Sequence, residues 1–156
     1  YGLNFYLEYK NFDFTVFFQG VHNVDVVSNV KRHTDFWSVQ DTYGNKGRRL
    51  LDAFDPVTNP DSDIPSVSSV DDNNEGRMST YYVENGSYLK LRNVQLGYTL
   101  PKELSERVKL SKLRLYVSGQ NLLTIKSKSF TGKDPENPNY GYPIPLTFTM
   151  GLNASF

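Results

Sequence analysis

Residues 146–156 read LTFTMGLNASF, and this stretch decides the fold class. Apolar residues occupy every second position, while threonine, glycine, asparagine and serine stand between them. A period of two is typical of a β-strand whose two faces meet different surroundings. One face would carry Leu146, Phe148, Met150, Leu152, Ala154 and Phe156, and the other would carry Thr147, Thr149, Gly151, Asn153 and Ser155. We therefore expect a strand over residues 145–156 with one apolar and one polar face.

The N-terminal residues show the same alternation twice. Apolar side chains recur at every second position in residues 1–9 and again, with polar residues mostly between them, in residues 12–20. Lys10 and Asn11 between them form a minimal two-residue turn. In such a hairpin Tyr9 and Phe12 are paired and point to the same side, so both apolar sets share one face.

Two further strands are predicted over residues 88–100 and 112–125. In the first of them, Leu89 and Leu91 have the opposite parity to Val94 and Leu96. This shift predicts a β-bulge near Asn93 or a change of environment along the strand. All eight prolines lie outside the strand interiors, which supports these boundaries.

The connections between the five strands alternate in length. The turn at 10–11 and the link 101–111, which includes a helical turn around 103–108, are short, whereas the segments 22–87 and 126–144 are long. Transmembrane β-barrels have short periplasmic turns and long extracellular loops. We therefore predict an all-β fold whose five antiparallel strands cross an outer membrane, with the long segments extracellular and the C-terminus periplasmic.

Five strands are too few to close such a barrel, because bacterial single-chain barrels start at about 8 strands. An open sheet in lipid would leave backbone groups without hydrogen bonds. The sequence is therefore interpreted as a part of a larger protein whose other strands complete the barrel. No run of residues is apolar for the roughly 20 positions that a transmembrane helix needs.

The composition excludes several other functions. Basic and acidic residues both number 17, so the basic excess that would favour nucleic acid is absent. The chain has no cysteines, which rules out disulfides, thiolate metal sites and cysteine nucleophiles. Its two histidines, His22 and His33, have no spacing to carboxylates that predicts a catalytic or metal centre.

Four segments resemble the SusC/RagA family of TonB-dependent outer-membrane transporters, in the same order along the chain. These are YKNFDF with FFQG (9–14 and 17–20), GSYLKLRNVQLGYTLP (86–101), LRLYVSGQNLLT (113–124) and YP with TFTMGLNASF (142–143 and 147–156). Together they span nearly the whole chain. The segment 51–54, where family members often carry a tryptophan, reads LDAF instead and is the weakest part of the match.

This resemblance implies that residues 1–156 are the C-terminal part of a 22-stranded barrel with a plugged lumen. It also implies import of oligosaccharides or peptides, driven by the TonB complex through an N-terminal part that this sequence does not contain. The implied partners are the rest of the barrel and its plug, a SusD-like lipoprotein lid, the barrel assembly machinery, lipid and the cargo. No catalytic residue and no cofactor is implied, so we expect a transport protein that is not an enzyme.

Some residues of the long segments are candidates for contact with cargo or lid. Aromatic rings stack on sugars and on peptide side chains, and those predicted to lie outside the membrane are Trp37, Tyr43, Tyr140 and Tyr142. They also have the simpler interpretation of packing the loops together. Phe156 resembles the terminal aromatic residue that the barrel assembly machinery reads, and it is equally suited to the membrane interface.

A calcium site is the one metal centre that the sequence raises. Residues 71–76 read DDNNEG and open like an EF-hand loop, but the position of the closing acidic ligand is Tyr82. A solvated acidic loop is the better interpretation, and we expect no metal.

The main alternative to a barrel wall is a soluble all-β carbohydrate-binding module. A sandwich of that kind also has short alternating strands and exposed aromatic residues. It explains the alternation of short and long connections less well. A glycoside hydrolase is a more distant alternative, because no pair of carboxylates has a convincing spacing.

Overall fold

The structure is a computed structural model that describes residues 1–36, 44–68, 74–139 and 141–156. The chain divides into two compact units. The sheet unit comprises Tyr1–His22, Tyr88–Lys126 and Ile144–Phe156. The loop unit comprises Asn23–Ser87 and Ser127–Pro143. The helices of the described part are all too short and too polar to cross a membrane.

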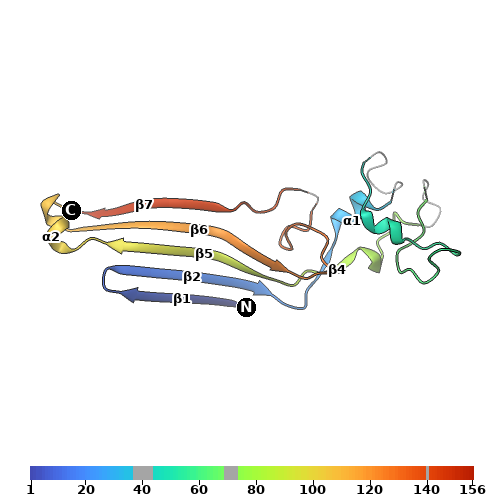
Figure 1. Cartoon of the computed structure of the whole chain (residues 1–156), viewed down its shortest axis with the longest axis horizontal. Helices are drawn as coiled ribbons and strands as arrows, with labels where there is room; N and C mark the ends of the chain where they lie inside the picture. Colours follow the sequence, from blue (N-terminus) through green and yellow to red (C-terminus); the bar gives the residue numbers. More distant parts are fainter. Residues whose placement is uncertain (37–43, 69–73, 140) are drawn as a thin grey trace. The chain divides into compact units, whose positions relative to one another are not determined.

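The sheet unit is a single antiparallel sheet of five strands in the order β1-β2-β5-β6-β7 (Figure 1). Its strands are β1 (Gly2–Tyr9), β2 (Phe12–Val21), β5 (Tyr88–Thr99), β6 (Lys112–Lys126) and β7 (Thr147–Ser155). Five antiparallel strands, as the alternation predicts, are therefore present. The last of them begins at Thr147, whereas the sequence pattern predicts a start at residue 145.

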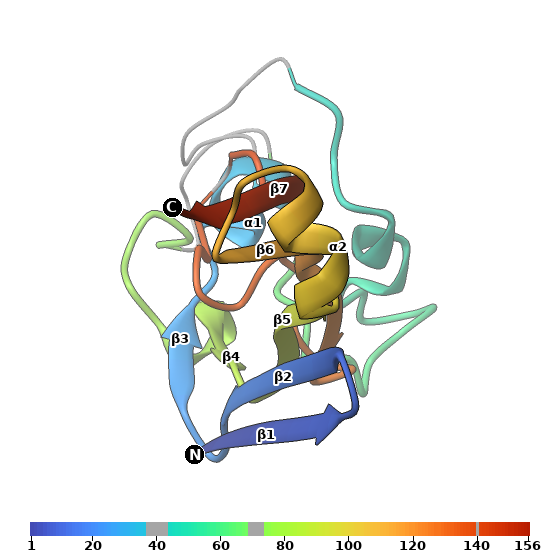
Figure 2. The same ribbon diagram turned by 90° about the vertical axis from the view of Figure 1, so that its left-hand side faces the viewer.

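The sheet has one layer, as the view along its strands shows (Figure 2). β1 and β7 are its two edge strands, so their apolar residues share one face and are not pressed against each other. In a sandwich these two apolar faces would pack together to form the core. The arrangement in the sheet unit thus argues against the soluble sandwich.

The short connections of the sheet unit both lie at one end of it (Figure 1). Tyr9 pairs with Phe12 across the turn, where Lys10 adopts a positive φ of 55°. The link from β5 to β6 contains helix α2 (Lys102–Arg107), at the place where a helical turn is predicted. The C-terminus lies at this same end (Figure 1).

A β-bulge in β5 reconciles the two parities of its apolar residues. Phe17 and Phe18 of β2 are consecutive, but they pair with Asn93 and Leu91, so Arg92 is the extra residue. Beyond the bulge, Leu91 lies on the same face as Val94 and the apolar residues that follow it. The bulge predicted near Asn93 is confirmed, and it keeps the apolar face continuous.

The loop unit contains secondary structure that the sequence pattern does not predict. Its elements are β3 (Asp25–Val27), α1 (Asn29–Thr34), the 3-10 helices η1 (Arg48–Asp52) and η2 (Thr80–Tyr82), and β4 (Val83–Asn85). β3 and β4 pair as a two-stranded antiparallel sheet. Phe36, Tyr82 and Phe130 are buried in this unit, and the ring of Phe36 packs against those of Tyr81 and Tyr82. The described parts of the long segments therefore fold as a compact unit instead of extending as irregular loops.

Candidate functional site: a sheet with two chemically different faces

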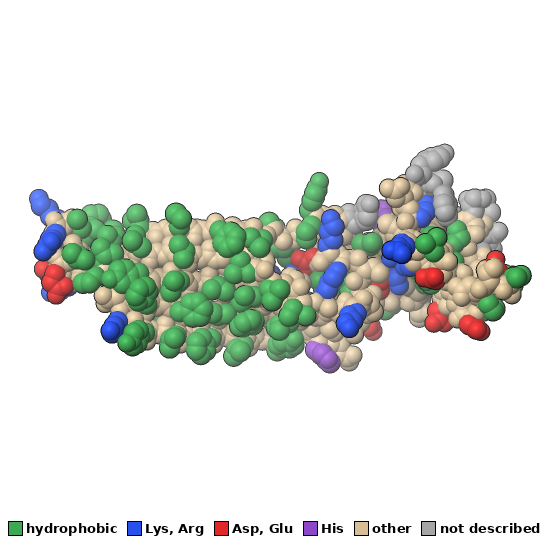
Figure 3. Space-filling view, viewed as in Figure 1, with side chains coloured by type: hydrophobic (Ala, Val, Ile, Leu, Met, Phe, Trp, Pro, Cys, Tyr) green, Lys and Arg blue, Asp and Glu red, His purple; other side chains and the backbone are tan. Residues whose placement is uncertain are grey.

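The apolar face of the sheet unit is made by rows of side chains that run across the strands. One row contains Leu7, Phe14, Leu96, Val117 and Met150, which are successive partners in the register. Most of these side chains are exposed, and Met150 retains 82% of its accessible surface. Figure 3 shows hydrophobic side chains spread over the sheet, with charged side chains at the end that carries α2. So large an exposed apolar area is typical of a surface that contacts lipid or a partner.

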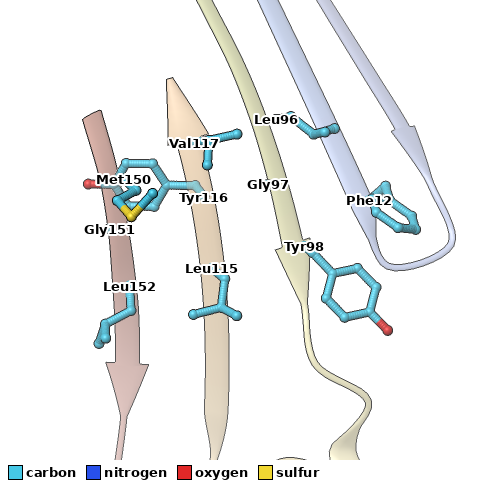
Figure 4. A pocket seen from close by; sticks show the side chains of 10 residues that line it. All are labelled: Phe12, Leu96, Gly97, Tyr98, Leu115, Tyr116, Val117, Met150, Gly151 and Leu152. Atoms are coloured by element: carbon cyan, nitrogen blue, oxygen red, sulfur yellow. The ribbon is translucent and has the colours of Figure 1, made fainter. Parts of the chain in front are cut away.

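A shallow hollow of about 590 Å³ lies on this apolar face (Figure 4). Four strands contribute its lining, which consists of Phe12, Leu96, Gly97, Tyr98, Leu115, Tyr116, Val117, Met150, Gly151 and Leu152. No residue of this lining carries a charge. Apart from the hydroxyls of Tyr98 and Tyr116 the lining has no polar side chain, and most of its surface suits hydrocarbon.

The opposite face is polar, and an ion pair crosses three strands on it. Asp13 lies on β2 and Arg114 on β6, and the guanidinium Nε of Arg114 donates to Oδ1 of Asp13 over 2.8 Å. The two side chains meet above Gly97 of β5, where an added methyl group would lie 2.5 Å from the Asp13 carboxylate. The glycine therefore makes room for a charge pair that holds β2, β5 and β6 in register.

The rest of the polar face consists mainly of amides and hydroxyls. One row contains Asn4, Phe17, Asn93, Gln120 and Thr147, and the next contains Tyr6, Thr15, Gln95, Ser118 and Thr149. The neighbouring row ends at Gly151, and the ring of Tyr116 lies beside this glycine. The polar residues of 147–155 thus share a face with polar residues of every other strand.

A buried carboxylate organises one side of the loop unit. The Asp35 side chain is fully buried and accepts hydrogen bonds from Nε of Arg49 at 2.7 Å and from the hydroxyl of Tyr81 at 2.6 Å. Burial and the bond to Asp35 raise the pKa of the Tyr81 hydroxyl. Burial opposes the charge of Arg49, but its bond to Asp35 outweighs this and raises the pKa of the guanidinium. The raised pKa keeps the Arg49 guanidinium charged at neutral pH, as expected of a structural ion pair.

A second buried carboxylate, Glu84, lies on β4. Its Oε1 is 3.3 Å from the ammonium of Lys31, and its Oε2 accepts hydrogen bonds from the backbone N–H and the hydroxyl of Thr131 at 2.9 and 3.0 Å. Sequence reasoning missed both carboxylate clusters. Only the folding of the long segments brings Asp35 close to Arg49 and Glu84 close to Thr131. No local sequence pattern marks these residues.

The predicted contact residues have different outcomes. Trp37, Tyr43 and Tyr140 lie outside the described residues, as do Asp71, Asp72 and Asn73 of the EF-hand-like segment. Tyr142 belongs to the loop unit and is 93% exposed. Phe156 follows β7 and is 97% exposed. Within the described ranges no three histidine or acidic side chains are grouped so that they could hold a metal ion.

Comparison with known proteins accounts for this architecture. No protein-family model matches the chain. Over 99% of its length it is 36% identical to TonB-dependent receptor P3 of Formosa agariphila, and over 99% it is 29% identical to TonB-dependent receptor SusC of Bacteroides thetaiotaomicron. The structure of the RagAB peptide importer in the open-open state matches 99% of the chain with a TM-score of 0.75 and 25% identity, and the chain covers 17% of the matched chain. The chain belongs to the SusC/RagA family of TonB-dependent receptors.

This SusC/RagA segment spans a small part of its relatives. It covers 16% of receptor P3 and 15% of SusC. RagAB in the closed-closed state also matches, with a TM-score of 0.69 over 95% of the chain. SusC/RagA proteins are outer-membrane β-barrels, in which an apolar outer face and a polar inner face are what the bilayer requires.

Proposed function

We propose that this chain forms part of the barrel wall of an outer-membrane transporter that imports oligosaccharides or peptides. The observation that carries the proposal is the continuous apolar face of the five-stranded sheet, exposed on one side while the other side is polar. Hydrocarbon would cover the apolar face, because burying apolar surface is favourable by about 25 cal/mol per Å². The polar face would line the lumen.

The rest of the transporter is proposed by similarity to the family. The wall would belong to a 22-stranded barrel with a plug, and the TonB complex would drive import. A SusD-like lipoprotein would cover the extracellular side. RagAB is called a peptide importer, which supports a peptide as one cargo class. SusC/RagA membership supports the lid and the energy coupling.

The proposed orientation places the end with the 10–11 turn and α2 in the periplasm and the loop unit outside the cell. Within the loop unit, Trp37, Tyr43, Tyr140 and Tyr142 are proposed contacts for cargo or lid. Phe156 is proposed as the residue that the barrel assembly machinery reads. The chain would act without a cofactor and without catalysis.

Uptake by cells that carry the complete transporter tests the import function. A deletion strain would be complemented with the full-length gene and given labelled oligosaccharides or labelled peptides, one class at a time. We expect uptake of one class to be restored by the gene. Equal uptake with and without the gene, for both classes, would contradict the proposal.

Cysteine labelling tests the orientation, because the chain itself has no cysteines. Val57 of the loop unit is exposed, as is Glu103 of α2. On intact cells a membrane-impermeant maleimide should label Val57→Cys and should label Glu103→Cys only after the outer membrane is permeabilised. Labelling of Glu103→Cys on intact cells, with Val57→Cys labelled only after permeabilisation, would show that the orientation is the opposite of the one proposed.

A further inference from the structure

The two long segments of the loop unit are joined at several places. Residues 23–87 connect β2 to β5, and residues 127–143 connect β6 to β7. At the base of the second segment, the backbone N–H of Ser127 donates to the carbonyl of Ser87 over 2.9 Å. Farther along, Nδ2 of Asn29 donates to Oδ1 of Asn139 over 2.7 Å. These bonds link the second segment to the first near both of its ends.

The centre of this junction is Thr131. Its backbone N–H and its hydroxyl both bond to Oε2 of Glu84, and its hydroxyl oxygen lies 3.0 Å from that of Ser28. Ser28 is almost fully buried and caps helix α1 by accepting a hydrogen bond from the N–H of Lys31. One threonine of the second segment therefore bonds to two elements of the first, strand β4 and the start of α1.

The carboxylate that Thr131 binds is itself held in place. The Glu84 side chain is 2% exposed and lies 3.3 Å from the ammonium of Lys31. Lys31 also donates to the carbonyl of Tyr81 over 2.8 Å and stands 4.5 Å from the centre of its ring. If Thr131 moved away, a buried carboxylate would lose two hydrogen bonds, which is costly in a low-dielectric environment. Separation of the segments is therefore disfavoured at this point.

We infer that the described parts of the segments 23–87 and 127–143 act as one rigid body during transport and do not separate at the Ser28–Thr131 contact. This inference rests on the proposed import function. It implies that any opening of the extracellular side moves both segments together, or moves another part of the transporter past them.

A reversible disulfide across the contact tests the inference. The hydroxyl oxygens of Ser28 and Thr131 are close enough for Ser28→Cys and Thr131→Cys to form a disulfide with small adjustments. The double variant would be made in the full-length transporter, oxidised in cells, and its import rate compared with that after reduction. Maleimide labelling of the denatured protein counts the thiols that remain free.

We expect the disulfide to form and the oxidised transporter to import its cargo within about twofold of the reduced one. Loss of import on oxidation with recovery on reduction would overturn the inference, because it would show that the segments must part. Failure of the thiols to react with each other would also overturn it, since it would contradict the contact.

Three controls separate the causes of a change. The parent transporter without either substitution shows the effect of the oxidant alone. Each single variant shows what the loss of one hydroxyl costs, including the cap of α1. If the parent transporter imports neither oligosaccharides nor peptides, the proposed import function is wrong. Loss of import only on oxidation of the double variant contradicts the rigid-body inference instead.

Discussion

At the scale of single residues, several glycines serve as space for a neighbouring side chain. No glycine in the described residues has a positive φ, so backbone freedom is not their role. Gly97 leaves room for the Asp13–Arg114 pair, and Gly151 leaves room for the ring of Tyr116. A methyl group at either position would displace an interaction that links neighbouring strands.

Gly97→Ala is predicted to lower the stability of the assembled barrel by about 1–3 kcal/mol, the usual cost of overpacking. The new methyl group would push the Asp13 carboxylate or the Arg114 guanidinium from its place. The measurement is the fraction of heat-resistant folded barrel on a gel as the temperature is raised. Gly141→Ala is the matched control, since an added methyl group there meets nothing within 4 Å. Equal melting of the two variants would remove the proposed role of Gly97.

The Tyr81 hydroxyl is predicted to remain protonated at a pH where exposed tyrosines ionise. Its pKa lies above the ordinary value of 10.0 because it is buried and bonded to Asp35. With the folded pKa raised, its contribution to stability is complete below pH 10 and is lost as pH rises through the folded pKa. Ultraviolet titration should thus show the same tyrosinate absorbance near pH 10 in the parent and in Tyr81→Phe. A smaller absorbance in the variant would contradict the raised pKa.

At the scale of secondary-structure elements, the bulge in β5 determines which side chains face outward. Arg92 is the extra residue, and its guanidinium donates to Gln19 on one side and Asn121 on the other. The bulge moves Leu89 and Leu91 to the same face as Leu96. A period of two without the bulge would point them to the polar side.

Deletion of Gln95, which has a partner on each neighbouring strand, is predicted to abolish most assembly of the barrel, because it would turn the residues on one side of it to the wrong face. Deletion of Arg92 is the matched control, since removing the extra residue leaves Leu91 and Val94 on the same face. We expect the deletion of Gln95 to reduce folded transporter in the outer membrane at least about tenfold more than the deletion of Arg92 does, which corresponds to about 1.4 kcal/mol. Similar amounts of the two proteins would contradict the role of the extra residue in keeping the apolar face continuous.

The two faces of β7 are predicted to differ in their tolerance of arginine. Phe148→Arg and Leu152→Arg should each cost about 2–4 kcal/mol if these positions lie near the middle of the bilayer. Thr149→Arg, on the opposite face of the same strand, should cost less because it would meet water. Folded transporter in outer-membrane fractions provides the comparison. Equal yields of all three variants would contradict the assignment of the faces.

At the scale of the whole molecule, the sheet unit depends on surfaces that this segment does not provide. Both edge strands, β1 and β7, have one neighbour within the sheet, and the apolar face is exposed. In a membrane the free edges would be costly, and in water the apolar face would promote association. The other strands of a barrel would pair with the free edges, and lipid would cover the apolar face.

Residues 1–156 produced alone are therefore predicted to aggregate in detergent-free buffer. The reason is the exposed apolar face together with two open strand edges. Size-exclusion chromatography and circular dichroism after refolding would check this. A folded, soluble monomer would contradict the membrane assignment and revive the soluble-module alternative.

Much of the sheet unit was predictable from local patterns. Alternation predicts its strands, the parity change near Asn93 predicts the bulge, and the residue pair 10–11 predicts the first turn. These features depend on residues that are close in the sequence. The ion pair of Asp13 with Arg114 was not predictable, because the two strands are separated by β5 and the contact also requires a glycine between them.

The sequence by itself determined the fold class of the protein. Apolar and polar residues alternate along its strands, and this alternation gives the sheet one apolar and one polar face. Only the tertiary structure decided the form of the long segments, where no such period exists. Their fold rests on buried groups such as Asp35 and Glu84, whose partners Arg49 and Thr131 lie 14 and 47 residues away, respectively. A carboxylate buried in that way is stable only beside those partners, so its place becomes visible only when the chain has brought them together.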